Sequence, residues 1–187
     1  MMALPKNFYV LTGGPGAGKT TLLNSLNALG FTTVPEEARK IIQQQMAVDG
    51  VGLPWKDKEA YAELMLNASI ETYTKHRLNN SSDTVFFDRG ILDTICYMKM
   101  ENISVTPATE NLIKQHPYNK NVFLLPPWQE IYTKDTERRQ TWKEALFTYE
   151  KMKETYSEYG YHIVEVPKAV AAQRALFVNN FIKSSLL

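Results

Sequence analysis

Residues 13–20 of the chain read Gly13-Gly14-Pro15-Gly16-Ala17-Gly18-Lys19-Thr20. This stretch is a complete G-x-x-x-x-G-K-[ST] motif, in which glycines allow backbone N–H groups to close around a polyphosphate. The lysine neutralises charge on the terminal phosphates, and the threonine hydroxyl can hold Mg²⁺. We therefore expect this loop and the adjoining Thr21 to bind a nucleoside triphosphate, with Lys19 taking part in catalysis.

The residues on either side of the loop supply the context that the motif needs. Phe8-Tyr9-Val10-Leu11 suits a buried parallel strand, and the stretch from Thr20 to Leu29 has the apolar spacing of a helix. Strand, loop and helix in this order are the arrangement in which such a motif binds phosphate. A glycine-rich turn without a ligand is therefore the weaker interpretation.

The composition is that of an ordinary globular protein. The 187 residues suit a single domain, 1–187, and the net charge of +1 offers no basic surface for nucleic acid or for a membrane. No apolar run approaches the roughly 18 residues that span a bilayer. Cys96 is the single cysteine, so no intrachain disulfide can form, which is typical of a reducing compartment. We expect a cytoplasmic protein, and its oligomeric state stays open.

Short apolar runs alternate with longer amphipathic stretches along the chain, which favours α/β layering. Strands are predicted at residues 8–11, 32–34, 84–88, 121–125 and 162–166, and helices in the longer stretches between and after them. This pattern predicts a three-layer P-loop NTPase fold, a five-stranded parallel sheet with helices on both faces. Ligands should bind at the carboxyl ends of the strands. The polar segment at about 126–140 is expected to form a small lid.

The strand pattern Val85-Phe86-Phe87 ends at Asp88, which Arg89 follows. An acid in this place can bind Mg²⁺, although Asp is also favoured as a helix N-cap. Motor and ring-forming ATPases usually carry a second acid here to polarise water. An arginine can instead clamp an acceptor or the transferring phosphoryl group. The pair therefore favours transfer to a bound acceptor over fast hydrolysis.

Two further acids, Glu36 and Glu37, follow the second predicted strand. A carboxylate there could take the proton from an acceptor hydroxyl, and we place Glu36 among the candidate catalytic residues. Equally, both acids could simply complement the dipole of the helix that they begin. The sequence leaves these alternatives open.

The predicted lid contains Arg138 and Arg139, one of which could swing over the phosphates as an arginine finger supplied in cis. Two exposed charges at the start of a helix are the alternative. Trp55, Tyr61 and Trp128 are candidate walls for an acceptor pocket. Cys96 lies among apolar helix residues, which predicts a buried thiol rather than a nucleophile.

Five stretches together resemble a small family of predicted ATPases, often called "AAA domain", that is related to the ribosylnicotinamide kinase domain of NadR. They are the phosphate loop, Val34-Pro35-Glu36-Glu37-Ala38-Arg39, Phe87-Asp88-Arg89-Gly90, Thr136-Glu137-Arg138-Arg139 and Val164-Glu165-Val166-Pro167. More distantly, the plan is similar to that of thymidylate and deoxynucleoside kinases. The resemblance spans nearly the whole chain, but only the phosphate loop is a highly specific match.

This resemblance implies roles for particular residues. Glu36 would act on the acceptor hydroxyl, Asp88 and Arg89 would form the acid–arginine pair after the third strand, and Arg138 and Arg139 would be the lid arginines. The loop after the last strand often contacts adenine in such kinases, which implicates Pro167 and Lys168.

The favoured hypothesis is a Mg²⁺-dependent kinase that uses ATP to phosphorylate a small hydroxyl-bearing metabolite such as a nucleoside. ATP is favoured over GTP because the sequence has no Asn-Lys-x-Asp guanine-reading motif. A nucleotide-binding regulatory switch, or a slow ATPase without a small-molecule acceptor, is the alternative. No motif specifies the acceptor.

Overall fold

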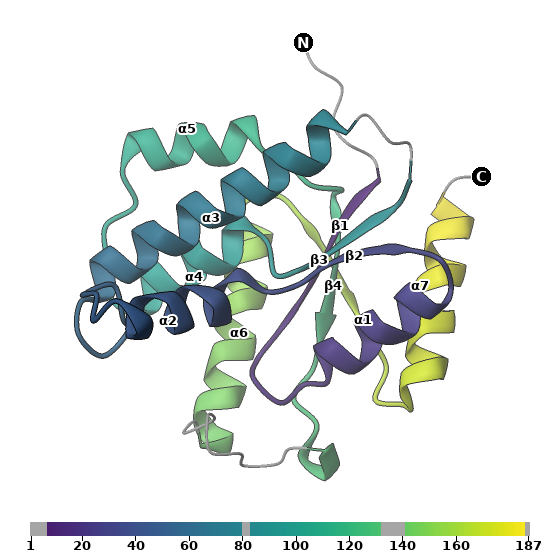
Figure 1. Cartoon of the computed structure of the whole chain (residues 1–187). Helices are drawn as coiled ribbons and strands as arrows, with labels where there is room; N and C mark the ends of the chain where they lie inside the picture. Colours follow the sequence, from purple (N-terminus) through teal and green to yellow (C-terminus); the bar gives the residue numbers. More distant parts are fainter. Residues whose placement is uncertain (1–6, 80–82, 132–140, 186–187) are drawn as a thin grey trace.

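The computed structural model describes residues 7–79, 83–131 and 141–185, which form five strands and seven α-helices (Figure 1). In chain order the elements are β1 (Phe8–Gly13), α1 (Lys19–Ala28), β2 (Thr32–Val34), α2 (Glu37–Ala47), α3 (Lys58–Leu78), β3 (Val85–Asp88), α4 (Ile91–Met100), α5 (Pro107–Gln115), β4 (Asn121–Leu125), the 3₁₀ turn η1 (Gln129–Ile131), α6 (Trp142–Glu158), β5 (His162–Glu165) and α7 (Ala171–Ser185).

The strands form one parallel sheet with the order β2-β3-β1-β4-β5. β1 lies at the centre, paired with β3 on one side and β4 on the other, so the phosphate loop leaves the middle of the sheet. The register pairs Leu11 of β1 with Asp88 of β3. The predicted α/β fold with a five-stranded parallel sheet is confirmed, and the carboxyl ends of β1, β2 and β3 meet at one edge.

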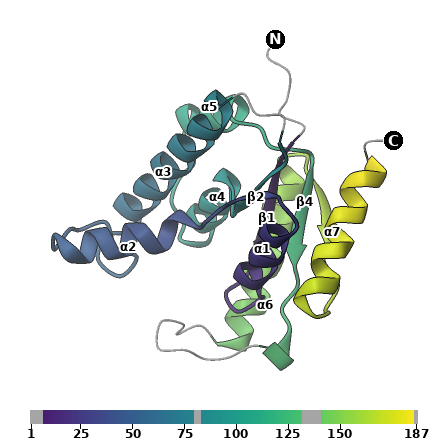
Figure 2. The same cartoon turned by 45° about the vertical axis from the view of Figure 1, so that its right-hand side comes forward.

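Helices cover both faces of the sheet (Figures 1 and 2). α1 and α7 pack together on one face, whereas α3, α4 and α6 lie on the other. The alternation of side chains along β1 divides the core accordingly. Tyr9 and Leu11 belong to the cluster beneath α1 and α7, and Phe8 and Val10 belong to the cluster beneath α3, α4 and α6.

Local capping interactions set several helix ends. α3 begins at Lys58, because the Asp57 side chain accepts from the backbone N–H of Ala60 and acts as the N-cap. Thr106 caps α5, and Pro107 occupies the first turn, where its missing N–H removes no helical hydrogen bond. The long polar connection before α6 ends in a capping box formed by Thr141 and Glu144.

Gly13, where β1 passes into the phosphate loop, lies in close contact with the backbone of β4. Its φ is 148°, and an added Cβ would lie 2.7 Å from the carbonyl oxygen of Leu125 in β4. Gly30 also has a positive φ, 92°, but nothing lies within 4 Å of its Cβ position. We expect Gly30→Ala to lower the free energy of unfolding by about 1 kcal/mol through backbone strain alone.

Gly13→Ala adds the contact with backbone to that strain and should lower the free energy of unfolding by about 3 kcal/mol. Urea unfolding of both variants measures the difference. Equal losses for the two variants would show that β1 and β4 can separate enough to accommodate a methyl group.

Candidate active site

The phosphate loop connects the end of β1 with the first turn of α1. Gly16 and Gly18 have φ angles of 77° and 84°, in the left-handed region that favours glycine. Gly18 directly precedes α1, so the unpaired N–H groups of the first helical turn face the loop. Thr20 and Thr21 lie exposed on that turn. This backbone arrangement is suited to binding an anion.

Lys19 is buried beneath the loop, and its Nζ donates a hydrogen bond to the carbonyl oxygen of Gly13 at 3.2 Å. Burial lowers the pKa of Lys19 and the cationic Arg89 lowers it further, whereas Asp88 and Glu36 oppose the shift. Negative charge placed beside Lys19, such as that of a polyphosphate, would favour its charged form. The lysine is therefore held where the motif predicts it to act.

Arg174 of α7 supports the loop from behind, a contact that the sequence analysis missed. Its Nη1 donates to the carbonyl oxygen of Ala17 at 3.0 Å and its Nε to that of Ala169 at 2.8 Å. The guanidinium also lies over the Trp128 ring, 5.4 Å from the ring centroid. One buried side chain thus joins the phosphate loop to the segments that follow β4 and β5.

Asp88 ends β3 beside the loop and is buried. In the described part of the chain, its Oδ1 has no hydrogen-bond partner. Burial raises the pKa of Asp88 and outweighs the opposing attraction of Lys19 and Arg89. The alternative role as a helix N-cap does not apply, because Gly90 occupies that position before α4. A buried carboxylate oxygen in this state fits a place where a cation or a bound ligand completes its shell.

Arg89 adopts a left-handed backbone conformation, with φ at 73°. Its backbone N–H donates to the carbonyl oxygen of Leu11 at 2.9 Å. The side chain joins two acids, since Nε contacts Glu36 Oε1 at 2.6 Å and Nη1 contacts Asp93 Oδ1 at 3.1 Å. Burial lowers the pKa of Arg89, but these two acids outweigh it and raise the pKa, so the guanidinium stays charged.

Glu36 and Glu37, the two acids that follow β2, have different environments, and a catalytic role for Glu36 stays a prediction. Burial raises the pKa of Glu36, but the attraction of Arg89 and Lys19 prevails and holds it at about 2. Glu36 is therefore ionised and engaged with Arg89 rather than serving only the helix dipole. The Glu37 carboxylate accepts from Thr72 Oγ1 at 3.0 Å and pairs with Lys40 at 3.2 Å.

Asp93, in the first turn of α4, is the second residue that the sequence analysis missed. Its Oδ1 accepts from Thr12 Oγ1 and from Arg89, and its Oδ2 accepts from the Gly90 N–H at 2.8 Å and the Tyr156 hydroxyl at 2.6 Å. Four donors thus surround this buried carboxylate. The (i, i+4) spacing from Arg89 was the available signal, but nothing in the sequence distinguishes it from a surface ion pair.

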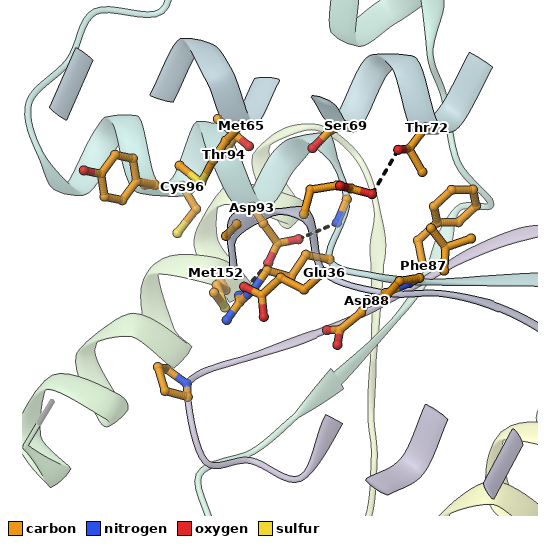
Figure 3. Close-up of a pocket in the computed structure, with 18 of the residues that line it drawn as sticks. Glu36, Met65, Ser69, Thr72, Phe87, Asp88, Asp93, Thr94, Cys96 and Met152 are labelled. Atoms are coloured by element: carbon orange, nitrogen blue, oxygen red, sulfur yellow. Dashed lines mark hydrogen bonds and ion pairs between the residues drawn. The ribbon is translucent and has the colours of Figure 1, made fainter. Parts of the chain in front are cut away.

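A cavity of about 280 Å³ opens beside the loop, between the sheet edge and α3, α4 and α6 (Figure 3). Its volume is close to the lower end of the about 300–1,000 Å³ that is typical of small-molecule sites. The wall at the sheet edge is charged, and the wall formed by helices is mainly apolar. Among the residues that line the cavity are Pro15, Glu36, Tyr61, Met65, Thr72, Phe87, Asp88, Arg89, Asp93, Cys96, Tyr97, Met100, Thr148 and Met152.

Of the three predicted aromatic walls, only Tyr61 lines this cavity. Trp55 is 63% exposed and lies on a separate shallow hollow, and Trp128 packs against Arg174 instead. Cys96 is buried as predicted, and burial raises the pKa of its thiol to about 11, which disfavours a nucleophilic role.

Several predicted site residues remain without a test. Arg138 and Arg139 lie outside the described residues, together with the rest of 132–140. The described part of the predicted lid segment ends with η1. Pro167 and Lys168 are exposed between β5 and α7, next to the Arg174 contact with Ala169. Their contact with adenine stays a prediction.

Within residues 7–79, 83–131 and 141–185, no cluster of three or more His, Cys, Asp or Glu side chains could hold a metal ion. A magnesium site built on Thr20 and Asp88 would take its remaining ligands from phosphate oxygens and water. None of the helices described is both long enough and apolar enough to traverse a bilayer.

The Glu36–Arg89 pair makes stability depend on pH. The folded-state pKa of Glu36, about 2, lies below its ordinary value of 4.5, so the unfolded chain takes up this proton first as the pH falls. The Glu36–Arg89 pair therefore contributes fully to the free energy of unfolding above pH 4.5, and this contribution is lost as the pH falls from 4.5 to 2. Urea unfolding should show that Glu36→Gln differs most from the parent protein at neutral pH and that the difference shrinks in this range. A difference that does not change with pH would contradict the ion pair.

Asp93→Asn should lower the free energy of unfolding by about 3 kcal/mol, because it removes the charge that balances a partly buried guanidinium. Glu101→Gln is the matched control, since Glu101 pairs with Lys58 at the surface and its loss should cost less than about 1 kcal/mol. Chemical denaturation measures both. If both variants lowered the free energy of unfolding equally, the buried Asp93 network would stabilise the fold no more than a surface ion pair does.

Known proteins resemble the chain over most of its length. A family model described as "AAA domain" matches residues 8–174. A protein of Frog virus 3 (isolate Goorha), named as a candidate deoxynucleoside kinase, is 27% identical over 133 residues, which is 67% of each chain.

Two solved structures share the fold. The structure of the NadR protein in complex with NR superposes with a TM-score of 0.73 at 17% identity, covering 96% of this chain and 52% of that one. The structure of deoxyadenosine kinase from M. mycoides with bound dATP gives 0.58 at 17% identity, with 93% and 98% covered. The chain thus spans about half of the NadR chain. Because the family model extends over most of the sequence, the chain belongs to this AAA-domain family, and its fold is that of the P-loop kinases of the NadR and deoxynucleoside kinase type.

Proposed function

We propose that the protein is a Mg²⁺-dependent kinase that transfers a phosphoryl group from ATP to a hydroxyl group of a small metabolite such as a nucleoside. The observation that supports this most is the position of the cavity. It lies directly beside the phosphate loop, and Glu36, Asp88 and Arg89 stand on the wall between the two. A donor site and an acceptor site therefore share one set of charged residues.

On the donor side, the loop residues 13–21 would surround the phosphates with backbone N–H groups, and Lys19 would neutralise the terminal oxygens. Thr20 and Asp88 would hold Mg²⁺, and Asp88 Oδ1, buried and unpartnered among the described residues, fits this role. The ion would neutralise charge on the transferring phosphates. Pro167 and Lys168 would contact the adenine.

On the acceptor side, Glu36 would accept a hydrogen bond from the attacking hydroxyl. A carboxylate with a pKa of about 2 is a weak base, so its main contribution would be to orient the hydroxyl. Orienting the hydroxyl without strong base catalysis suffices for phosphoryl transfer, because little bond formation precedes departure of the leaving group. Arg89, fixed by two acids, would face the transferring group, and Arg138 or Arg139 would close over the phosphates.

The charges around the loop favour a kinase over a fast ATPase. The place where many ATPases have a water-polarising acid is occupied by Arg89, whose guanidinium is paired with Glu36 and Asp93. An acceptor bound in the cavity beside the loop would take the place of water near the reacting phosphate. The names of the relatives, a candidate deoxynucleoside kinase, deoxyadenosine kinase and NadR, support a nucleoside or a related riboside as the acceptor.

A coupled assay of ADP release tests this function. With ATP, Mg²⁺ and a panel of nucleosides and ribosides, at least one acceptor should raise ADP release well above the acceptor-free rate, and EDTA should abolish the increase. Lys19→Ala should lower the acceptor-dependent kcat at least about 100-fold, because the loss of one preorganised donor to the reacting oxygens lowers kcat by about this factor or more.

Lys183→Ala is the control, because this lysine lies in the last turn of α7, away from the site. ATP binding with no acceptor-dependent turnover across the panel would contradict the kinase and favour a nucleotide-dependent switch. A slow ATPase would instead show acceptor-independent ADP release that Lys19→Ala removes.

A further inference from the structure

Buried polar atoms without partners are concentrated on the cavity. Across the described residues, three buried side-chain atoms have no hydrogen-bond partner: Asp88 Oδ1, Tyr97 Oη and Thr148 Oγ1. All three residues line this one cavity. Folded proteins satisfy most buried polar groups, because each one left without a partner costs about 1–3 kcal/mol. Asp88 belongs to the donor side, which leaves two hydroxyl groups unexplained.

The two hydroxyls come from different helices and different parts of the cavity wall. Thr148 lies one turn along α6 from Ala145, whose carbonyl oxygen is 3.4 Å from the Cβ position of Gly14 in the phosphate loop. Tyr97 lies on α4, and its ring meets the edge of Tyr61 on α3 at 5.5 Å between centroids. Thr148 is therefore close to the loop, and Tyr97 belongs to the wall formed by α3 and α4.

The charges on the wall restrict the ligand that could bind between these hydroxyls. Of the described residues that line the cavity, four are acids, Glu36, Glu37, Asp88 and Asp93, and Arg89 alone is basic. The Arg89 guanidinium is already paired with Glu36 and Asp93. Lys40 and Lys19 offset part of this acidic charge. The described lining nevertheless offers no unpaired cation to a carboxylate or phosphate on the acceptor, so burying such a group there is unfavourable.

We propose that Tyr97 and Thr148 are specificity-determining residues that bind the phosphate acceptor through their hydroxyl groups, and that this acceptor carries no negative charge. The inference deepens the proposed kinase function and rests on it. Apolar contact comes from Met65, Met100 and Met152, whose flexible side chains adapt to a ring. Burial raises the pKa of Tyr97, so its hydroxyl remains protonated and can donate.

Paired substitutions test the hydroxyls in the free protein first. Tyr97→Phe and Thr148→Val remove groups without a partner, so the Tm should stay within about 2 °C of the parent value or rise. Tyr73→Phe and Thr109→Val are matched controls on hydroxyls that have partners, the Pro117 carbonyl oxygen and the Thr106 hydroxyl. Both controls should lower the Tm. A clear fall for Tyr97→Phe and Thr148→Val as well would show that these hydroxyls have partners in the free protein, and would overturn the inference.

Ligand binding and turnover are measured next. The probes are adenosine, deoxyadenosine, thymidine and deoxycytidine as uncharged compounds, nicotinamide riboside as a cation and shikimate as an anion. With the best uncharged or cationic probe, each cavity variant should raise KM or Kd about 5-fold to 10-fold and change kcat little, which is the loss expected for one hydrogen bond. The two control variants should leave KM and Kd unchanged.

The outcomes separate this inference from the proposed function. Turnover of a probe with KM unaffected in both cavity variants would overturn the inference and leave the kinase standing. Binding that the variants weaken, without turnover, would overturn the kinase and support the binding site. Shikimate as the preferred probe would overturn the charge restriction. If no probe shifts the Tm of the parent protein or is phosphorylated, both proposals fail.

Discussion

The guanidinium of Arg89 is the interaction on which the rest of the site depends. It joins Glu36, which follows β2, to Asp93 on α4, while its own backbone bonds to β1. A partly buried cation needs its counter-charges in place, because removing one of them leaves charge uncompensated at low dielectric. The left-handed conformation of Arg89 is unfavourable by itself, and these contacts offset it. The charged residues Glu36, Arg89 and Asp93 on the cavity wall are therefore held in place together.

The same arginine gives neighbouring carboxylates different properties. Glu36 is held ionised by Arg89 and Lys19. Asp93 uses its oxygens on four donors within the protein. Asp88 is buried with one oxygen unpartnered among the described residues, and its pKa is raised. Three carboxylates are thus divided into an ionised group, a fully hydrogen-bonded group and a group with an unpartnered oxygen, and this division comes from their environments.

Sequence patterns predicted the elements well and the tertiary contacts poorly. The strands and the parallel sheet follow from short apolar runs and from the phosphate loop, because local chemistry determines both. Asp93 and Arg174 carry no distinctive local signal, since even the (i, i+4) spacing of Asp93 from Arg89 resembles a surface ion pair. Only the fold places Thr12 and Tyr156 beside Asp93, and Ala17 and Trp128 beside Arg174. For the aromatic residues the error was different, because the sequence suggested cavity-lining roles for Trp55 and Trp128 that the fold does not give them. Trp55 is large and apolar, but the fold leaves it 63% exposed and away from the cavity.

The distribution of unsatisfied groups connects stability with function in this fold. The two clusters that cover the faces of the sheet are filled by aliphatic and aromatic side chains. The unpartnered buried atoms of the described residues are confined to the cavity wall, where each one lowers stability without any gain in packing. A sequence that specifies its core this closely could also have provided hydrogen-bond partners for Thr148 and Tyr97. Under the proposed function, their lack of partners is a stability cost that a bound acceptor would remove. The cavity wall would then indicate the second ligand, as the glycine-rich loop indicates the first.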